Sequence, residues 1–199
     1  MSKTVTYNSI KRFLDIVGAT IGLIILSPLY IIIYIAIKLT TEGPAFYCQE
    51  RIGLGGKPFN IYKFRTMLVN TESDGIPQLA EENDGRLTSI GKFLREHHLD
   101  ELPQLWNVLV GDMSFVGHRP ERKYFIDKIM EQRPDYSKLY QIRPGITSMA
   151  TIYNGYTNTM AKMIIRLDMD LEYLDNQSLL LDLKIVCKTF FAVFLGRKV

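Results

Sequence analysis

Two adjacent acidic residues stand at the start of a helical pattern in the middle of this 199-residue chain. Asp100 and Glu101 lie in LDELPQLWNV, just ahead of Pro103, a residue that the first turn of a helix accepts. A carboxylate there lies in the positive field of a helix N-terminus, which favours its ionised form. An ordinary helix cap with an acidic neighbour fits the same residues. The pair alone therefore leaves a catalytic and a structural interpretation open.

Cationic side chains beside turns or prolines indicate phosphate binding. They are Lys63 and Arg65 in YKFRT, Arg119 in GHRP and Arg143 in IRPG. Arginine can bind phosphate oxygens through two donors, and lysine supplies a point charge. Carboxylates repel a phosphoryl substrate unless a hard cation such as Mg²⁺ lies between them, with Asp100 and Glu101 as its protein ligands. The combination predicts magnesium-dependent phosphoryl chemistry, although each cation taken alone fits a surface ion pair.

The most apolar segment precedes these residues and runs from Phe13 to Ile37 with one charged residue, Asp15. A straight helix of roughly 25 residues at about 1.5 Å each would cover a bilayer core. Pro28 removes an internal hydrogen bond, and the Ser27 hydroxyl can bond back to a carbonyl, so a bend is expected here. We predict a helix-break-helix that enters and leaves the same face of the membrane, with a kinked span as the alternative.

Basic residues flank this segment on both sides, with Lys11 and Arg12 before it and Lys38 and Arg51 after it. Because positive residues accumulate on the cytoplasmic side, both ends are expected there. We therefore divide the chain into a membrane anchor, residues 1–41, and a cytosolic domain, residues 42–199.

The cytosolic domain is predicted to be α+β and mainly helical. Turn residues within 46–67 favour a small β-hairpin, and the polar segment 70–86 is a candidate lid. Apolar spacing predicts two helices over 88–110 that join near residues 97–100, and further helices over 122–132 and 160–174. A last amphipathic helix over 179–195 would lie on the core or at the membrane interface.

Composition narrows the classes of partner. The net charge of +3 does not indicate a nucleic-acid-binding protein. Cys48 and Cys187 are too few for a disulfide framework or a zinc site. His97 and His98 are neighbours that face different ways on a helix, so no metal is assigned to them.

The order of the sequence blocks resembles the small monotopic phosphoglycosyl transferases, also called bacterial sugar transferases. The blocks include KRFLDIVGATIGLIILSP, QERIGLGGKPFNIYKFRTM, LDELPQLWNVLVGDMSFVG and RPGIT. The resemblance implies transfer of a sugar phosphate from a UDP-sugar to polyprenyl (undecaprenyl) phosphate. It places this reaction on the cytosolic face of the bacterial inner membrane. The reaction would begin a capsule, O-antigen, exopolysaccharide or glycoprotein glycan.

The resemblance also implies roles for individual residues. Asp100 would be the nucleophile that carries a covalent phosphosugar, and Glu101 its partner acid at the metal. Asp170 matches a further acid of the site, whereas Arg119 and Lys63 match cationic positions. Ser27-Pro28 matches the helix break of a re-entrant membrane hairpin.

Two segments depart from the family pattern. His118 stands where proline usually precedes the arginine-proline pair, and SMAT, residues 148–151, replaces the usual GWAQ after RPGIT. We expect both segments near the nucleotide sugar, so the sugar specificity is predicted to be unusual. His118 fits either a contact with sugar or phosphate or a local turn.

Two other functions use the same residues. A membrane-anchored metal-dependent phosphatase or pyrophosphatase would use water as the final acceptor. A non-catalytic anchoring subunit of a glycan assembly complex would use Asp100-Glu101 only as a helix cap. The sequence does not name the sugar or decide between a monomer and a homodimer.

Overall fold

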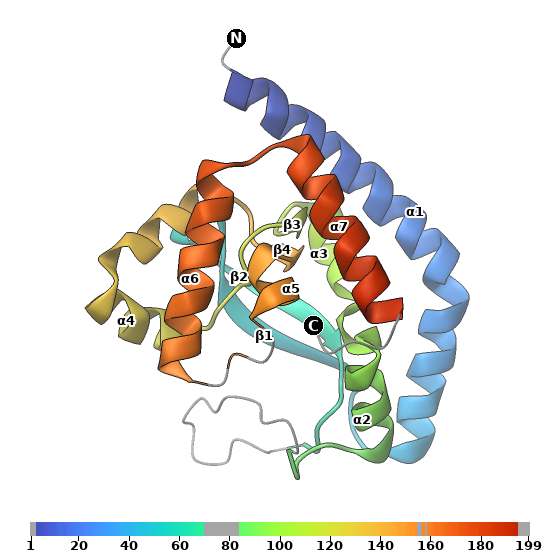
Figure 1. The fold of residues 1–199 in the computed structure, drawn as a ribbon. Helices are drawn as coiled ribbons and strands as arrows, with labels where there is room; N and C mark the ends of the chain where they lie inside the picture. Colours follow the sequence, from blue (N-terminus) through green and yellow to red (C-terminus); the bar gives the residue numbers. More distant parts are fainter. Residues whose placement is uncertain (1–2, 70–83, 155–156, 158, 195–199) are drawn as a thin grey trace.

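The computed structural model describes residues 3–69, 84–154, 157 and 159–194. Most of the candidate lid, residues 70–86, lies outside the described residues. A long N-terminal helix runs along one side of the molecule, a β-hairpin lies at the centre, and helices cover the opposite side (Figure 1). The predicted mainly helical α+β organisation with a small hairpin is confirmed.

Helix α1, Lys3–Thr40, is one hydrogen-bonded helix with Pro28 inside it. The predicted break between two helices at Ser27-Pro28 is therefore not observed, because α1 continues through these residues. Instead the helix axis changes direction about midway along its course (Figure 1), as expected where proline removes a backbone donor. The Ser27 hydroxyl donates to the Ile24 carbonyl at 2.8 Å, in the turn just before the proline. The predicted boundary at residue 41 falls just after α1, and the two-domain division stays a prediction.

Both halves of α1 pack on the same body. In the first half, Ala19 is buried with Ile61 of the central hairpin. In the second half, Ile33 and Ile37 are buried with Phe64 of the same hairpin. The long helix is thus attached to one body along most of its length rather than at one end.

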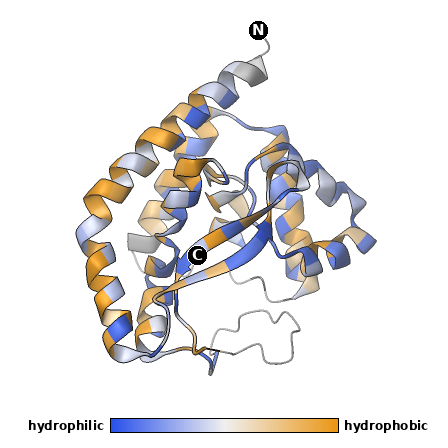
Figure 2. Cartoon of the chain, turned by 180° about the vertical axis from the view of Figure 1, so that it is seen from behind, coloured by the Kyte–Doolittle hydropathy of each residue, from blue (hydrophilic) through white to orange (hydrophobic). Residues whose placement is uncertain are grey.

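Most of α1 beyond its polar first turns is coloured hydrophobic in Figure 2, and many of its apolar side chains are exposed. Its exposed side chains include Phe13, Ile21, Ile24, Ile25, Ile31, Ile32 and Leu39. Within the described residues, Thr6–Thr40 is the one stretch that is long and apolar enough to cross a membrane, judged by length and composition alone.

The predicted hairpin is present as strands β1, Phe46–Ile52, and β2, Pro58–Phe64, which pair antiparallel with Phe46 opposite Phe64. The one-turn 3-10 helix η1, Leu54–Gly56, joins them. Gly55 and Gly56 have positive φ angles in this connection, a conformation that glycine adopts without a steric cost.

The two helices predicted over residues 88–110 are α2, Ser89–Glu96, and α3, Gln104–Val110. Between them lies the short 3-10 helix η2, Leu99–Glu101. Thr88 caps α2, because its side-chain oxygen accepts the Gly91 N–H at 2.9 Å. Gly111 ends α3 in the left-handed conformation typical of a helix C-terminus.

The remaining helices form the opposite side. The predicted helices over 122–132, 160–174 and 179–195 are α4, Lys123–Gln132, α6, Met160–Asp175, and α7, Leu179–Phe194. The 3-10 helix η3, Pro134–Gln141, and the short helix α5, Met149–Tyr153, complete this side. One buried cluster joins α4, η3 and α6 through Phe125, Ile129, Leu139 and Leu167.

A second sheet, which the sequence analysis did not predict, supports the loop that carries Arg119. Strand β3, Ser114–Val116, pairs parallel with β4, Gly145–Thr147. The backbone approach is close where the loop leaves β3. A Cβ on Gly117 would lie 2.3 Å from the Arg143 carbonyl oxygen, so only glycine fits there.

Candidate active site

The acidic pair lies in the tight connection between α2 and α3. His98 adopts a left-handed backbone conformation with φ 53°, which turns the chain into η2. Asp100 and Glu101 then form part of η2, and Leu102 and Pro103 keep helical angles up to the start of α3. Asp100 is buried, at 6% exposure.

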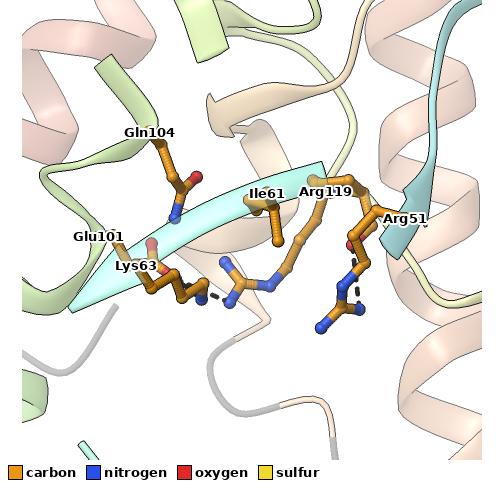
Figure 3. Close-up of a pocket in the computed structure, with 7 residues that line it drawn as sticks. Arg51, Ile61, Lys63, Glu101, Gln104 and Arg119 are labelled. Carbon is orange, nitrogen blue, oxygen red and sulfur yellow. Dashed lines mark hydrogen bonds and ion pairs between the residues drawn. The ribbon is translucent and has the colours of Figure 1, made fainter. Parts of the chain in front are cut away.

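Glu101 forms ion pairs with two cationic side chains that are distant in sequence. Lys63 Nζ of β2 lies 2.5 Å from Glu101 Oε1. Arg119 Nη2, from the loop after β3, lies 3.0 Å from the same oxygen. Figure 3 shows the two cationic side chains converging on Glu101 beside the hairpin. Three predicted site residues that are far apart in sequence are therefore brought together.

These residues line a pocket with Arg51, Ile61, Gln104 and Pro120 (Figure 3). Three of the lining side chains are cations, and Glu101 is the one carboxylate among the described lining residues. The pocket is therefore suited to a ligand that brings several negatively charged oxygens.

The pKa values of the two neighbouring acids are shifted in opposite directions. Burial and the negative charge of Glu101 raise the pKa of Asp100, although Lys63 opposes this. Burial also works against ionisation of Glu101, yet the charges of Lys63 and Arg119 hold its pKa well below the usual range. Glu101 is thus fixed as an anion, and an added positive charge near Asp100 would favour ionisation of that carboxyl.

A buried ion-pair triad stands behind the pocket and holds Arg51. Glu121 Oε2 accepts from Arg51 Nη1 at 3.2 Å, and Glu121 Oε1 accepts from Arg166 Nη2 of α6 at 2.8 Å. Glu121 and Arg166 side chains are each only 7% exposed. The triad joins β1, the Arg119 loop and α6, so it fixes the wall of the pocket.

Asp170 lies behind the Arg119 loop rather than in the pocket lining. The residue is 2% exposed, the Ser148 hydroxyl and the Arg119 backbone N–H lower the pKa of its carboxyl, and its Oδ1 has no hydrogen-bond partner within the described residues. Burial raises the pKa of Asp170 to about 7, although the Arg166 charge opposes this shift. These contacts suit a residue that positions Arg119, and direct substrate binding by Asp170 stays a prediction.

The raised pKa of Asp170 has a measurable consequence for stability. An acid whose pKa is higher in the folded state loses stability as pH rises from its unfolded pKa to its folded pKa, here from about 4 to about 7. The free energy of unfolding should fall by up to about 1.4 kcal/mol per pH unit in this window. We expect the Tm of wild type to decline between about pH 4 and pH 7 relative to that of Asp170→Asn, and to level off above this window. A Tm difference that stays constant with pH would contradict this.

Two other predicted cations lie outside the pocket lining. Arg65 Nη2 donates to Thr41 Oγ1 at 2.5 Å, at the end of α1. Arg143 Nε donates to the Gly111 carbonyl at 2.8 Å, at the end of α3. Both side chains stabilise helix ends in this structure, and their phosphate contacts stay predictions.

His118 is buried at 1% exposure, and burial together with the Arg166 charge lowers its pKa to about 3. The ring is therefore neutral at physiological pH. Neither ring nitrogen has a hydrogen-bond partner within the described part of the chain. The His118 carbonyl accepts the Gly145 N–H at 2.8 Å, which ties the loop to β4.

The acidic pair fits Mg²⁺ only as an incomplete ligand set. Mg²⁺ is usually bound by one or two carboxylates together with substrate phosphates. Asp100 and Glu101 supply the carboxylates, and the described residues hold no group of three or more His, Cys, Asp or Glu that could bind a metal. The donor chemistry therefore fits an ion that a phosphate-bearing substrate helps to bind.

A comparison with protein families places this geometry in a known context. The family model described as bacterial sugar transferase matches residues 6–196. The chain belongs to the bacterial sugar transferase family. The resemblance seen in the sequence is thereby confirmed, and the match includes α1 from Thr6 onward, the hairpin and the whole pocket.

Similar proteins in this family have named activities. The chain is 41% identical over 190 residues to the UDP-N-acetylgalactosamine-undecaprenyl-phosphate N-acetylgalactosaminephosphotransferase of Aeromonas hydrophila, covering 96% of this chain and 45% of the relative. It is 42% identical to the UDP-glucose:undecaprenyl-phosphate glucose-1-phosphate transferase of Escherichia coli (strain K12), covering 94% of this chain and 41% of the relative. The chain thus spans less than half the length of these two relatives.

Residues of the site that the sequence analysis did not single out are Arg51, Gln104, Glu121 and Arg166. Gln104 carried a local signal, because it lies four positions after Asp100 in a helical pattern and shares its face. The others carried none, since their partners lie on distant segments.

Proposed function

We propose that this chain transfers a sugar-1-phosphate from a UDP-sugar to undecaprenyl phosphate, or another polyprenyl phosphate. The observation that carries the proposal is the meeting of Lys63 and Arg119 on Glu101, next to buried Asp100. This cationic pocket suits a diphosphate, and the named activities of the relatives use UDP-sugars and undecaprenyl phosphate.

In the first step, a carboxylate oxygen of Asp100 attacks the phosphorus that bears the sugar. A new O–P bond forms, the bond to the bridging oxygen breaks, and UMP leaves with the electron pair. In the second step, a phosphate oxygen of the polyprenyl phosphate attacks the same phosphorus, and Asp100 leaves as a carboxylate. Splitting the transfer into two displacements is ordinary covalent catalysis.

Burial of Asp100 supports a covalent role. Exclusion of water protects a reactive acyl phosphate from hydrolysis until the lipid acceptor arrives. Lys63 and Arg119 would contact phosphate oxygens. Their ion pairs with Glu101 support this role, because they hold both cations at the pocket.

Magnesium dependence is part of the proposal, with Asp100 and Glu101 as the residues that would hold the ion. Bound Mg²⁺ supplies charge neutralisation on the phosphate oxygens. The two arginines and the lysine of the pocket orient the diphosphate around the acidic pair.

We also propose that α1 enters and leaves the cytosolic face of the bacterial inner membrane. The packing of both its halves on one body supports this, because the body then lies on one side of the bilayer. Exposed Leu180, Leu183 and Phe190 on α7 would rest at the interface beside it. The bend at Pro28 lets both ends of α1 face the cytosol.

Cysteine labelling tests this topology. Cys48 is exposed just after α1, and Asn8 is exposed near its start. We expect a membrane-impermeant maleimide to label both Cys48 and an Asn8→Cys variant in inverted membrane vesicles, and neither in spheroplasts. Each site is examined with the other native cysteines replaced by serine. Labelling of the two sites from opposite sides would show a span instead.

The proposed reaction is tested by UMP release from a panel of UDP-sugars in detergent with Mg²⁺, with and without undecaprenyl phosphate. Sustained release that requires the lipid, with formation of a lipid-linked diphosphate sugar, is the expected result. Sustained release without lipid would indicate a hydrolase. Absence of release with every sugar would favour an anchoring subunit.

A further inference from the structure

Two buried amide side chains on α3 differ in how their hydrogen bonds are satisfied. Asn107 is fully buried, its Oδ1 accepts the Tyr62 N–H at 3.1 Å, and its Nδ2 donates to the Asn60 carbonyl at 2.7 Å. Asn107 therefore joins α3 to β2 and has a structural role.

Gln104 is 2% exposed, yet its Nε2 has no acceptor within hydrogen-bonding distance among the described residues. The side chain lines the pocket, and its amide nitrogen points toward Lys63 and Glu101 (Figure 3). A buried donor without an acceptor costs about 1–3 kcal/mol. Such an atom at the wall of a pocket indicates an acceptor that arrives with a ligand.

The surroundings of Gln104 identify the chemistry of that acceptor. Lys63, Arg119 and Arg51 make the pocket cationic, so it selects anionic oxygens. Glu101 Oε1 accepts from both Lys63 and Arg119, and Gln104 Nε2 does not donate to it. The Gln104 amide N–H therefore remains available to an incoming oxygen.

Gln104 also lies on the same side of its helical segment as the acidic pair. Leu102 has φ −52° and ψ −39°, and Pro103 has φ −59° and ψ −16°, so helical geometry continues from η2 into α3. Residues three and four positions apart then share a face, which aligns Gln104 with Glu101 and Asp100. An oxygen on the phosphorus that Asp100 is proposed to attack would then lie on the side of this segment that carries Gln104.

We propose that Gln104 Nε2 donates a hydrogen bond to a non-bridging oxygen of the phosphoryl group transferred from the nucleotide sugar. The inference deepens the proposed function and rests on it. A neutral donor at this position binds the oxygen without adding to the positive charge of the pocket, and it stabilises charge as it develops on the phosphoryl group.

The test compares Gln104→Ala with Asn107→Ala. We expect Gln104→Ala to lower kcat/KM for UMP release by about 10- to 100-fold, within the range of losing one preorganised donor. Its Tm should not fall by more than about 2 °C, because removal of a buried donor that has no protein acceptor offsets the packing lost with the side chain. Asn107→Ala should lower Tm by several degrees and change kcat/KM less than about threefold at a permissive temperature, since it leaves the Tyr62 N–H and Asn60 carbonyl unpaired.

An isosteric variant tests the same hydrogen bond without removing the volume of the side chain. Gln104→Glu preserves the shape of the side chain but replaces the donor with an acceptor, so it should lose at least as much kcat/KM as Gln104→Ala. If both Gln104 variants keep wild-type kcat/KM, the inference is overturned.

A binding measurement separates this inference from the proposed function. Inorganic pyrophosphate should raise the Tm of wild type more than that of Gln104→Ala, and this readout needs no turnover. If wild type releases no UMP but the pyrophosphate effect still depends on Gln104, the proposed function fails and the phosphate contact stands. An equal Tm shift in both proteins, or no shift in either, overturns the contact.

Discussion

Asp100→Asn is expected to reduce UMP release at least about 1,000-fold, the scale typical of removing a catalytic nucleophile. Asparagine has nearly the size of aspartate but cannot form the proposed acyl phosphate. Because burial already disfavours the charged form of Asp100, the variant should unfold at a Tm equal to or above that of wild type. The measurement is UMP release over time together with thermal unfolding.

The matched control for this variant is Asp127→Asn, an exposed acid on α4 that should leave both readouts unchanged. An Asp100→Asn protein that is folded and releases UMP within tenfold of wild type would exclude the covalent mechanism. A loss of activity accompanied by a large fall in Tm would assign Asp100 a structural role instead.

Glu121→Ala is expected to have the largest effect on stability. The change leaves the guanidinium groups of Arg51 and Arg166 without their shared carboxylate in a buried position. Removing one partner of a buried ion pair costs about 3–5 kcal/mol. For a chain of this size that corresponds to a Tm decrease of roughly 6–20 °C. Thermal unfolding in detergent measures it.

The control for Glu121 is the exposed pair Lys123–Asp127, whose side chains are 70% and 55% exposed. Asp127→Ala removes a carboxylate only a few residues away and should change the free energy of unfolding by less than about 0.5 kcal/mol. A Tm change for Glu121→Ala as small as that of Asp127→Ala would show that the triad does not hold the pocket wall.

The fold was predictable where the pattern is local. The helix expected over 160–174 is α6, Met160–Asp175, because an apolar face repeats along it. The pairing of β3 with β4 was not predictable, since each strand has three residues and Ser114 pairs with Gly145 far along the chain. The effect of Pro28 was predictable only as a bend, because packing of both flanking halves keeps α1 one helix.

The site, like the fold, could be predicted from the sequence only in part. The chemistry of Lys63, Glu101 and Arg119 was visible in their types and neighbours, and the structure brings these three together. The sequence did not show that Arg65 and Arg143 lie outside the pocket, because they are basic residues beside turns or prolines just as Lys63 and Arg119 are. Only the fold shows that Arg65 and Arg143 bind backbone or hydroxyl groups at helix ends.

The proposed covalent chemistry can be measured directly by intact-protein mass spectrometry after incubation with a UDP-sugar that supports turnover, in the absence of polyprenyl phosphate. We predict a mass increase equal to one phosphosugar, localised by peptide mapping to Asp100, absent from Asp100→Asn and removed by adding undecaprenyl phosphate. Turnover to a lipid-linked diphosphate sugar with no adduct on rapid quenching, or an adduct on another residue, would contradict the proposed role of Asp100.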